Sequence, residues 1–343
     1  MSDISIRTEG RAGRITLTRA HALNALTHDM ALAIEAALDA WRDDEAVALV
    51  ILDAEGDKAF CAGGDIAALY ASGKAGDFAY GRRFWADEYR LNAKLAEYPK
   101  PIVSLMQGFT MGGGVGLGCH VSHRIVGESS RIAMPECGIG LVPDVGGSLL
   151  LARAPGRLGA YLGLTAARLE PGDAILAGFA DHFIPQARWP DLIAGLCESG
   201  DVGAIADARE DAPEGPLHPK RAQIDRLMAG DSLPEILSAL QADDSPFAAE
   251  TLKAVRRNSA LAMACTLELL SRLAAPDAGI RDALDLEYRV TWRAMEHGDV
   301  LEGIRAAIID KDRKPVWKHG IDSLPPGVAA DMLMPLGGNA LTF

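Results

Sequence analysis

Short apolar runs alternate with amphipathic stretches along the first third of this 343-residue chain. Residues 47–52 and 102–106 are apolar runs bounded by polar residues, as in strands buried on both faces. Apolar residues at helical spacing follow Thr27, a residue that commonly caps helices, and residues 78–98 form a second helical stretch that ends before a proline. Strands and helices in this order favour an α/β fold with a parallel sheet.

The two ends of the chain depart from this alternation. Residues 4–7 and 15–18 alternate apolar and polar side chains, with glycines between them, which predicts an N-terminal hairpin. Beyond about residue 190 strand patterns disappear, and helical stretches follow one another, separated by Gly, Pro and Asp. We therefore predict an α/β core over residues 1–200 and a helical C-terminal region over residues 201–343.

Charge and cysteine content exclude several classes of protein. The chain has 47 acidic and 34 basic residues, a net charge of −13, whereas nucleic-acid-binding surfaces are basic. Five cysteines without a CxxC pair argue against a disulfide framework or a zinc site and favour a reducing compartment. The N-terminus has no signal-peptide pattern, and no apolar run approaches ~18 residues. We expect a cytoplasmic protein with no nucleic-acid or membrane partner.

Two glycine motifs stand at predicted junctions between strand and helix. Gly112–Gly114 lies where a helix is expected to begin, and Gly63 and Gly64 follow a predicted strand, just before Asp65. Either motif alone is compatible with a flexible turn or with close packing of a strand on a helix. Together they indicate backbone that a ligand can approach closely, because glycine has no side chain in the way.

Three carboxylates are candidates for chemistry, and each also has an ordinary structural explanation. Glu136 follows a Met-Pro pair and could be a solvated loop residue. Asp144 lies between Pro143 and Val145 and could cap a helix that begins near Gly146. Glu88 lies in a helical stretch and could be exposed on its surface. The sequence pattern by itself leaves these alternatives open.

In combination these motifs resemble those of the crotonase (enoyl-CoA hydratase/isomerase) superfamily, and most of all its 3-hydroxyisobutyryl-CoA hydrolase branch. The resemblance rests on FCAGGDI at residues 60–66, TMGGGVGL at 110–117, the Glu136 and Asp144 motifs, and the E-Y-x-L-N stretch that begins at Glu88. It extends to the tail at residues 301–317, so it spans nearly the whole chain. It implies a ββα spiral core that binds a CoA thioester, followed by helices that cover the active site.

The resemblance also implies an activity and a set of site residues. The reaction would be hydrolysis of a short-chain 3-hydroxyacyl-CoA, most of all 3-hydroxyisobutyryl-CoA in valine breakdown. Backbone N–H groups of Gly64 and Gly113 would form the oxyanion hole for the thioester oxygen. Glu136 and Asp144 would be catalytic, and both would contact substrate together with Glu88 and Gly113. No metal or redox cofactor is implied, since coenzyme A is part of the substrate, and a homo-oligomer is possible.

The sequence leaves the mechanism open. Glu136 would either attack the carbonyl to give an anhydride or activate a water molecule. Asp144 would bind the 3-hydroxyl or handle the leaving group's proton, and Glu88 would help to hold the hydroxyl end. An enoyl-CoA isomerase or hydratase is the alternative enzyme, although Gly116 stands where hydratases carry a second glutamate. A non-enzymatic RNA-binding or scaffold protein is a third reading, which the net charge of −13 disfavours.

Other reactive side chains receive structural explanations. His120 and His123 are three residues apart, but the sequence offers no evident third metal ligand. Cys61 has apolar neighbours and no adjacent base, so we expect it to pack as a small apolar side chain.

Overall fold

The structure is a computed structural model that describes residues 3–343. It divides into two compact units, each built from separate segments of the chain. Unit 1 contains Met1–Gly64, Arg90–Ala133 and Arg168–His218, and unit 2 contains Asp65–Tyr89, Met134–Ala167 and Pro219–Phe343. The two units are described separately below.

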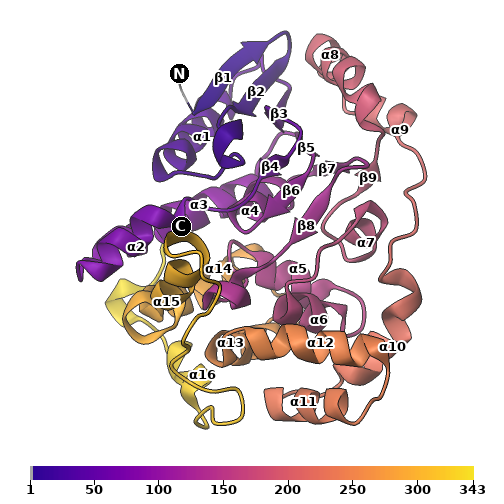
Figure 1. The fold of residues 1–343 in the computed structure, drawn as a ribbon. Helices are drawn as coiled ribbons and strands as arrows, with labels where there is room; N and C mark the ends of the chain where they lie inside the picture. The colour runs from indigo at the N-terminus through magenta and orange to yellow at the C-terminus, as the bar shows by residue number, and fades with distance from the viewer. Residues whose placement is uncertain (1–2) are drawn as a thin grey trace. The chain divides into compact units, whose positions relative to one another are not determined.

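Nine short strands form two sheets within the described residues, all of them in unit 1 (Figure 1). The strands are β1 (Ile4–Glu9), β2 (Ala12–Leu17), β3 (Leu49–Ala54), β4 (Ala59–Cys61), β5 (Ile102–Met106), β6 (Phe109–Met111), β7 (His123–Val126), β8 (Arg131–Ala133) and β9 (His182–Phe183). The larger sheet has the order β1-β2-β3-β5-β7-β9 and the smaller sheet β4-β6-β8. Only the β1–β2 hairpin is antiparallel; the other pairs in both sheets are parallel.

Helices make up most of the remaining described chain. They are α1 (His28–Trp41), α2 (Ile66–Lys74), α3 (Phe78–Ala96), α4 (Gly113–Gly118), α5 (Gly147–Arg153), α6 (Leu158–Thr165), α7 (Pro171–Leu176), α8 (Trp189–Ser199), α9 (Ala204–Ala208), α10 (Arg221–Leu227), α11 (Leu233–Gln241), α12 (Pro246–Arg257), α13 (Ala260–Arg272), α14 (Ile280–His297), α15 (Val300–Ile304) and α16 (Val328–Met332). Short 3₁₀ segments are η1 (Ala20–Ala22), η2 (Glu136–Ile139), η3 (Gln186–Arg188), η4 (His218–Lys220) and η6 (Gly337–Asn339), and η5 (Arg305–Ile309) is a π-helix.

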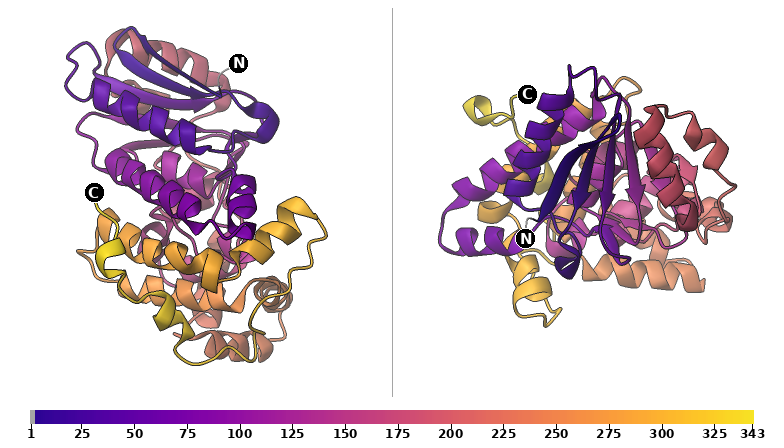
Figure 2. Two further views of the ribbon diagram at one scale, coloured as in Figure 1. Left: turned by 90° about the vertical axis from the view of Figure 1, so that its left-hand side faces the viewer. Right: turned by 90° about the horizontal axis from the view of Figure 1, so that it is seen from above.

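The larger sheet of unit 1 is buried between helices. Figure 2 shows α1 on one side of the strands and α8 and α9 on the other. On the second side, Leu49, Ile51 and Val103 belong to one apolar cluster with Leu192 and Leu196 of α8. Strands covered on both faces must be apolar on both faces, which explains why the predicted strands appear as continuous apolar runs.

Unit 2 is helical and is built around α13. This helix packs against α5, α6, α11, α14 and α16. Its residues Leu261, Cys265 and Leu269 lie at helical spacing in one buried cluster with Val142 and Val290. A helix that contacts neighbours on several sides has little exposed surface, so most of its side chains must be apolar. The sequence of α13 meets this requirement.

The expected α/β class, the N-terminal hairpin and the helices after residue 200 are confirmed. The two contact units differ from the expected division at residue 200, because residues 65–89 and 134–167 belong to the mainly C-terminal unit. A chain that leaves and re-enters a unit produces no single change in composition that marks a boundary.

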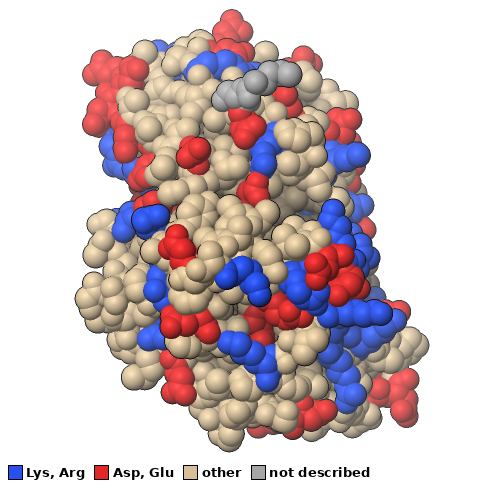
Figure 3. All heavy atoms as spheres, turned by 60° about the vertical axis from the view of Figure 1, so that its left-hand side comes forward, with Lys and Arg blue, Asp and Glu red and all other residues tan. Residues whose placement is uncertain are grey.

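No helix among the described residues is long and apolar enough to span a membrane. Figure 3 shows acidic and basic side chains interspersed over the face that it draws.

Candidate active site

Gly64 and Gly113 lie at equivalent places after two adjacent strands of unit 1. Strands β4 and β6 are parallel, and Cys61 is paired with Thr110. Each glycine follows its paired residue by three positions, so both lie beyond the carboxyl ends of neighbouring strands. Among the described residues no carbonyl or side chain accepts a hydrogen bond from either glycine N–H. The two N–H groups thus follow the ends of neighbouring strands and donate to no backbone carbonyl in the part of the chain that the structure describes.

Close packing explains the glycines beside them. A Cβ atom on Gly114 would lie 2.1 Å from the carbonyl oxygen of Cys61, so only glycine fits there. Gly112 has φ 48° and ψ −120° at the start of α4. Helix α4 has only six residues. The dipole of so short a helix contributes little, so any binding of an anionic group there would depend on the individual N–H groups.

The three candidate carboxylates belong to a buried cluster in unit 2. The exposed fraction is 3% for Glu88, 5% for Glu136 and 5% for Asp144. The charges of Asp144 and Glu88 both affect the ionisation of Glu136, which places the three carboxyls near one another. A fourth buried carboxyl, Glu287 of α14, belongs to the same group. Neither Glu88 nor Glu136 is the solvated surface residue that its local sequence allowed.

A hydrogen bond from Tyr89 holds the side chain of Asp144. Tyr89 of α3 donates a hydrogen bond from its hydroxyl to Oδ2 of Asp144 over 2.7 Å, and both groups are buried. Helix α5 begins at Gly147 and has Gly146 as its N-cap. The side chain of Asp144 therefore does not cap this helix, although its backbone oxygen accepts from the N–H of Gly147 over 2.7 Å. The capping explanation for Asp144 is wrong.

Glu136 begins the short helix η2, and α13 anchors this segment. The N–H of Ser259 donates to the carbonyl oxygen of Cys137 over 3.0 Å. The Cys137 thiol and the Thr266 hydroxyl are 3.3 Å apart and share a hydrogen bond. These contacts fix the backbone next to Glu136, while its Oε2 atom is buried and has no hydrogen-bond partner within the described chain.

Burial raises the pKa of each of these carboxyls, because the charged form loses its hydration. The pKa values of Glu88 and Glu136 lie well above their ordinary value, first from burial and then from the charge of Asp144. Burial raises the pKa of Asp144 to about 6, against the hydrogen bond from Tyr89, which lowers it. Carboxyls with raised pKa values can take up and release protons near neutral pH, as general acid–base chemistry requires.

The residues described by the structure contain no group of three or more His, Cys, Asp or Glu that could hold a metal ion. His123 lies in β7, where burial lowers its pKa. Cys61 is buried at the end of β4, as expected for a small packing residue.

Sequence reasoning assigned no role to Tyr89 or Glu287. A signal for Glu287 was present: Leu284, Glu287 and Thr291 lie on one stripe of α14, and all three are buried. A glutamate on the apolar stripe of a helix requires hydrogen-bond partners, and such a position indicates a specific role. Its partners are far away in sequence and could not be predicted.

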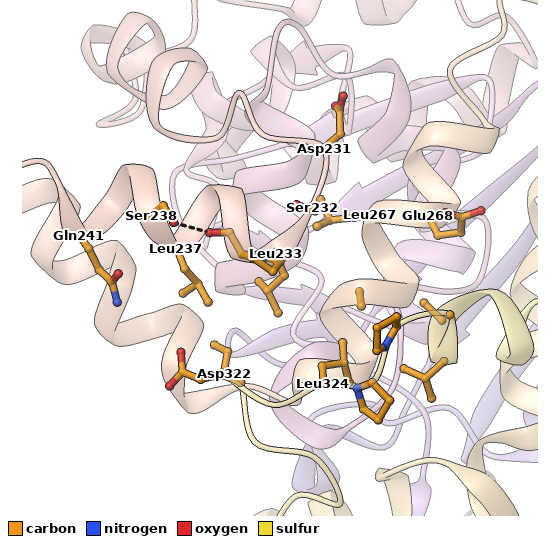
Figure 4. A pocket seen from close by; sticks show the side chains of 18 residues that line it. Asp231, Ser232, Leu233, Leu237, Ser238, Gln241, Leu267, Glu268, Asp322 and Leu324 are labelled. Atoms are coloured by element: carbon orange, nitrogen blue, oxygen red, sulfur yellow. Dashed lines mark hydrogen bonds between the residues drawn. The ribbon is translucent and has the colours of Figure 1, made fainter.

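A separate cavity of about 550 Å³ lies in unit 2 between α11, α13 and the segment that contains Leu324 (Figure 4). Its lining is largely apolar, including Leu233, Leu237 and Leu267, with Asp322 and Glu268 among the polar residues. None of the candidate site residues lines it.

Comparison with known proteins identifies the family. The family model described as enoyl-CoA hydratase/isomerase matches residues 12–326, and the chain belongs to this family, the crotonases. A mitochondrial 3-hydroxyisobutyryl-CoA hydrolase from Gallus gallus is 37% identical over 99% of this chain and 91% of its own. The corresponding protein from Xenopus tropicalis is 40% identical over 90% of this chain and 82% of its own.

Solved structures share the fold and carry other names. An enoyl-CoA hydratase from Rhodobacter sphaeroides is 62% identical, with a TM-score of 0.96 and full coverage of both chains. A carnitinyl-CoA dehydratase from Mycobacterium thermoresistibile is 40% identical, with a TM-score of 0.95 over 100% of this chain and 99% of its own. The chain is thus a crotonase-family enzyme with the crotonase fold, and its relatives carry both hydrolase and hydratase names.

Proposed function

We propose that this enzyme hydrolyses the thioester of a short-chain 3-hydroxyacyl-CoA, with 3-hydroxyisobutyryl-CoA as the substrate and valine breakdown as its setting. One observation carries the proposal. Oε1 of Glu88 and Oε2 of Glu136 are buried without a hydrogen-bond partner in the described chain, and they belong to one cluster with Asp144. Buried acceptors without partners are costly, and a substrate hydroxyl or a water molecule would supply the missing donors.

The proposed reaction divides the work between the two sets of residues. The N–H groups of Gly64 and Gly113 donate to the thioester oxygen as negative charge develops on it. Glu136 either attacks the carbonyl carbon and expels the CoA thiolate, or removes a proton from the water that attacks. In the first route water then cleaves the anhydride. In both routes the products are a carboxylic acid and free CoA thiol.

The other two carboxyls act on the acyl group and on the proton. Glu88 accepts a hydrogen bond from the 3-hydroxyl of the substrate. Asp144 binds the same hydroxyl or delivers a proton to the departing thiolate, and its pKa of about 6 suits either protonation state.

Hydration or isomerisation of an enoyl-CoA is the second candidate, and the name of the 62% identical structure favours it. Hydration by two carboxylates would require a second glutamate at position 116. That position is a buried glycine of α4, with its N–H bonded to the carbonyl oxygen of Gly112 over 3.2 Å. A glycine supplies no proton, so the site favours hydrolysis.

A pair of substrates tests the proposal. The rate of thiol release is measured with 3-hydroxyisobutyryl-CoA and with isobutyryl-CoA, which has the same carbon skeleton without the hydroxyl. A site built to bind a hydroxyl rejects the analogue that lacks it, so we expect kcat/KM to differ by at least about 10²-fold. Glu88→Gln is expected to reduce this preference. Equal rates with the two substrates would contradict the assignment of a 3-hydroxyacyl substrate.

A further inference from the structure

The turn that carries Asp144 has a strained backbone. Val145, the next residue, has φ 54°, and Gly146 after it has φ 80°. Glycine adopts positive φ at little cost, but valine is β-branched and rarely does so. Such strain persists only where surrounding contacts impose it. Val145 is 1% exposed, so the turn is enclosed by the protein.

Glu287 of α14 accepts hydrogen bonds from the backbone of this turn. Its Oε2 accepts from the N–H of Gly146 over 2.8 Å, and its Oε1 accepts from the N–H of Ser148 over 3.1 Å and from the Ser148 hydroxyl. In the described chain no backbone carbonyl accepts from either N–H. One fully buried carboxyl thus binds the backbone on both sides of Gly147, at the start of α5.

The residue next to Glu287 supports the side chain of Asp144 from another direction. Tyr288 packs edge-on against Tyr89, with ring centroids 6.1 Å apart and an angle of 75° between the planes. Tyr89 in turn donates its hydroxyl to Asp144. Two successive residues of α14 therefore contact both supports of Asp144: its backbone turn and the hydroxyl that holds its carboxylate.

We propose that Glu287 is a positioning residue, which keeps the turn at residues 144–148 in its strained conformation and thereby aims the carboxylate of Asp144. The role in catalysis depends on the proposed function, whereas the role in holding the turn does not. Glu287 lies among other titratable groups. Its charge raises the pKa of Tyr89 and of Glu136, and the charge of Asp144 raises the pKa of Glu287.

The variant Glu287→Gln separates this role from simple space filling. Glutamine has the same size, but one of its two terminal atoms is an NH₂ donor. In either orientation of the amide, the N–H of Gly146 or the N–H of Ser148 then faces a donor and loses its acceptor. Ser148→Ala is the matched control, because it removes the hydroxyl and leaves both N–H groups bonded to Glu287.

Amide hydrogen exchange and steady-state kinetics compare the two variants with the unmodified protein. Amide hydrogen exchange of Gly146 and Ser148 is expected to be slow in the unmodified protein and at least about tenfold faster in Glu287→Gln, because an N–H without an acceptor opens more readily. With 3-hydroxyisobutyryl-CoA, kcat is expected to fall at least about tenfold with KM within about threefold, because a displaced carboxylate affects the chemical step more than binding. Ser148→Ala is expected to stay within about threefold of the unmodified protein for both parameters.

The controls distinguish the possible failures. The kcat of Glu287→Gln is measured at a temperature at which circular dichroism shows it to be folded, so a residue with a merely structural role would leave kcat unchanged. Unchanged exchange at Gly146 and Ser148 together with unchanged kcat would overturn the proposal. If Glu287→Gln does not fold, fast exchange of these two amides in the unmodified protein would overturn it instead. An unmodified protein that releases no thiol contradicts the proposed function, while the exchange data still decide whether Glu287 holds the turn.

Discussion

Removing the hydroxyl of Tyr89 tests the electrostatics of the carboxyl cluster. This hydroxyl donates to Oδ2 of Asp144 over 2.7 Å, and it stabilises the ionised carboxylate. A hydrogen bond to a charged group contributes about 1.5–3 kcal/mol, and one pKa unit corresponds to about 1.4 kcal/mol. Tyr89→Phe should therefore raise the pKa of Asp144, which is about 6 in the unmodified protein, by at least about one pKa unit.

The assay is the pH dependence of kcat/KM for thiol release, which reports the ionisation of essential groups in the free enzyme. The sign follows from the lost donor: the ionised form of Asp144 is less stable in the variant, so the limb of the profile that belongs to Asp144 moves to higher pH. Tyr288→Phe is the matched control. Its hydroxyl donates to the carbonyl oxygen of Arg82 over 3.1 Å and not to Asp144, so its profile should not move.

Superimposable profiles for Tyr89→Phe and the unmodified enzyme would refute this reasoning. They would mean either that Asp144 does not titrate in the catalytic range or that its hydrogen bond to Tyr89 does not control its ionisation. An equal movement in Tyr288→Phe would show that ring packing, and not the hydroxyl, sets the pKa.

Three further predictions concern the reaction and the stability of the fold. Glu136→Gln should lower kcat for thiol release by at least about 10²-fold, because it removes the proposed base or nucleophile; near-normal turnover would exclude both routes. Gly114→Ala should lower the free energy of unfolding by about 1–3 kcal/mol in urea titrations, since its Cβ would lie 2.1 Å from the Cys61 carbonyl oxygen. Gly195→Ala, with nothing within 4 Å of its Cβ, should not destabilise the protein, and equal losses in the two variants would contradict the packing argument. Burial raises the pKa of Glu287 from 4.5 to about 8, so its contribution to stability is present below pH 4.5 and lost as the pH rises through about 8. The stability of the unmodified protein relative to Glu287→Gln should therefore decrease over this range, and a difference independent of pH would contradict the raised pKa.

Local patterns in the sequence were sufficient to predict those elements whose caps and apolar spacing lie within a few residues of one another. The hydroxyl of Thr27 accepts from the N–H of Met30 over 3.2 Å and caps α1, as its position before an amphipathic stretch predicts. Ile34 and Leu38, at helical spacing, are both fully buried. In these cases capping and apolar spacing both indicate the same helix, so the prediction needs no knowledge of distant contacts.

The existence and pairing of the smaller sheet could not be predicted in this way, although a strand was expected before Gly63. Strands β4, β6 and β8 have three residues each, too few for an alternating pattern to be distinguished from a loop. They exist because they pair with one another across long stretches of chain, as Cys61 does with Thr110. That pairing is what places Gly64 and Gly113 beyond neighbouring strand ends.

The residues of the candidate site likewise fall into two groups: those that a local motif identifies and those whose role depends on distant contacts. Glu88, Glu136 and Asp144 were found through motifs, and the structure adds that they are buried in one cluster. The roles of Tyr89 and Glu287 depend on contacts that link separate segments, such as the bond between Glu287 and the N–H of Gly146, which lies 141 residues earlier. The apolar stripe of α14 indicates that Glu287 needs hydrogen-bond partners, but the identity of those partners emerges only when the fold is known.

The most direct test of the central claim follows two substrates in parallel with the purified protein. Thiol release is recorded with 3-hydroxyisobutyryl-CoA, and the loss of enoyl absorbance is recorded with crotonyl-CoA. We predict rapid thiol release from the first substrate and little loss of absorbance with the second, because the site lacks a carboxylate at Gly116. Rapid hydration of crotonyl-CoA without thiol release would contradict the hydrolase assignment and establish the enzyme as a hydratase.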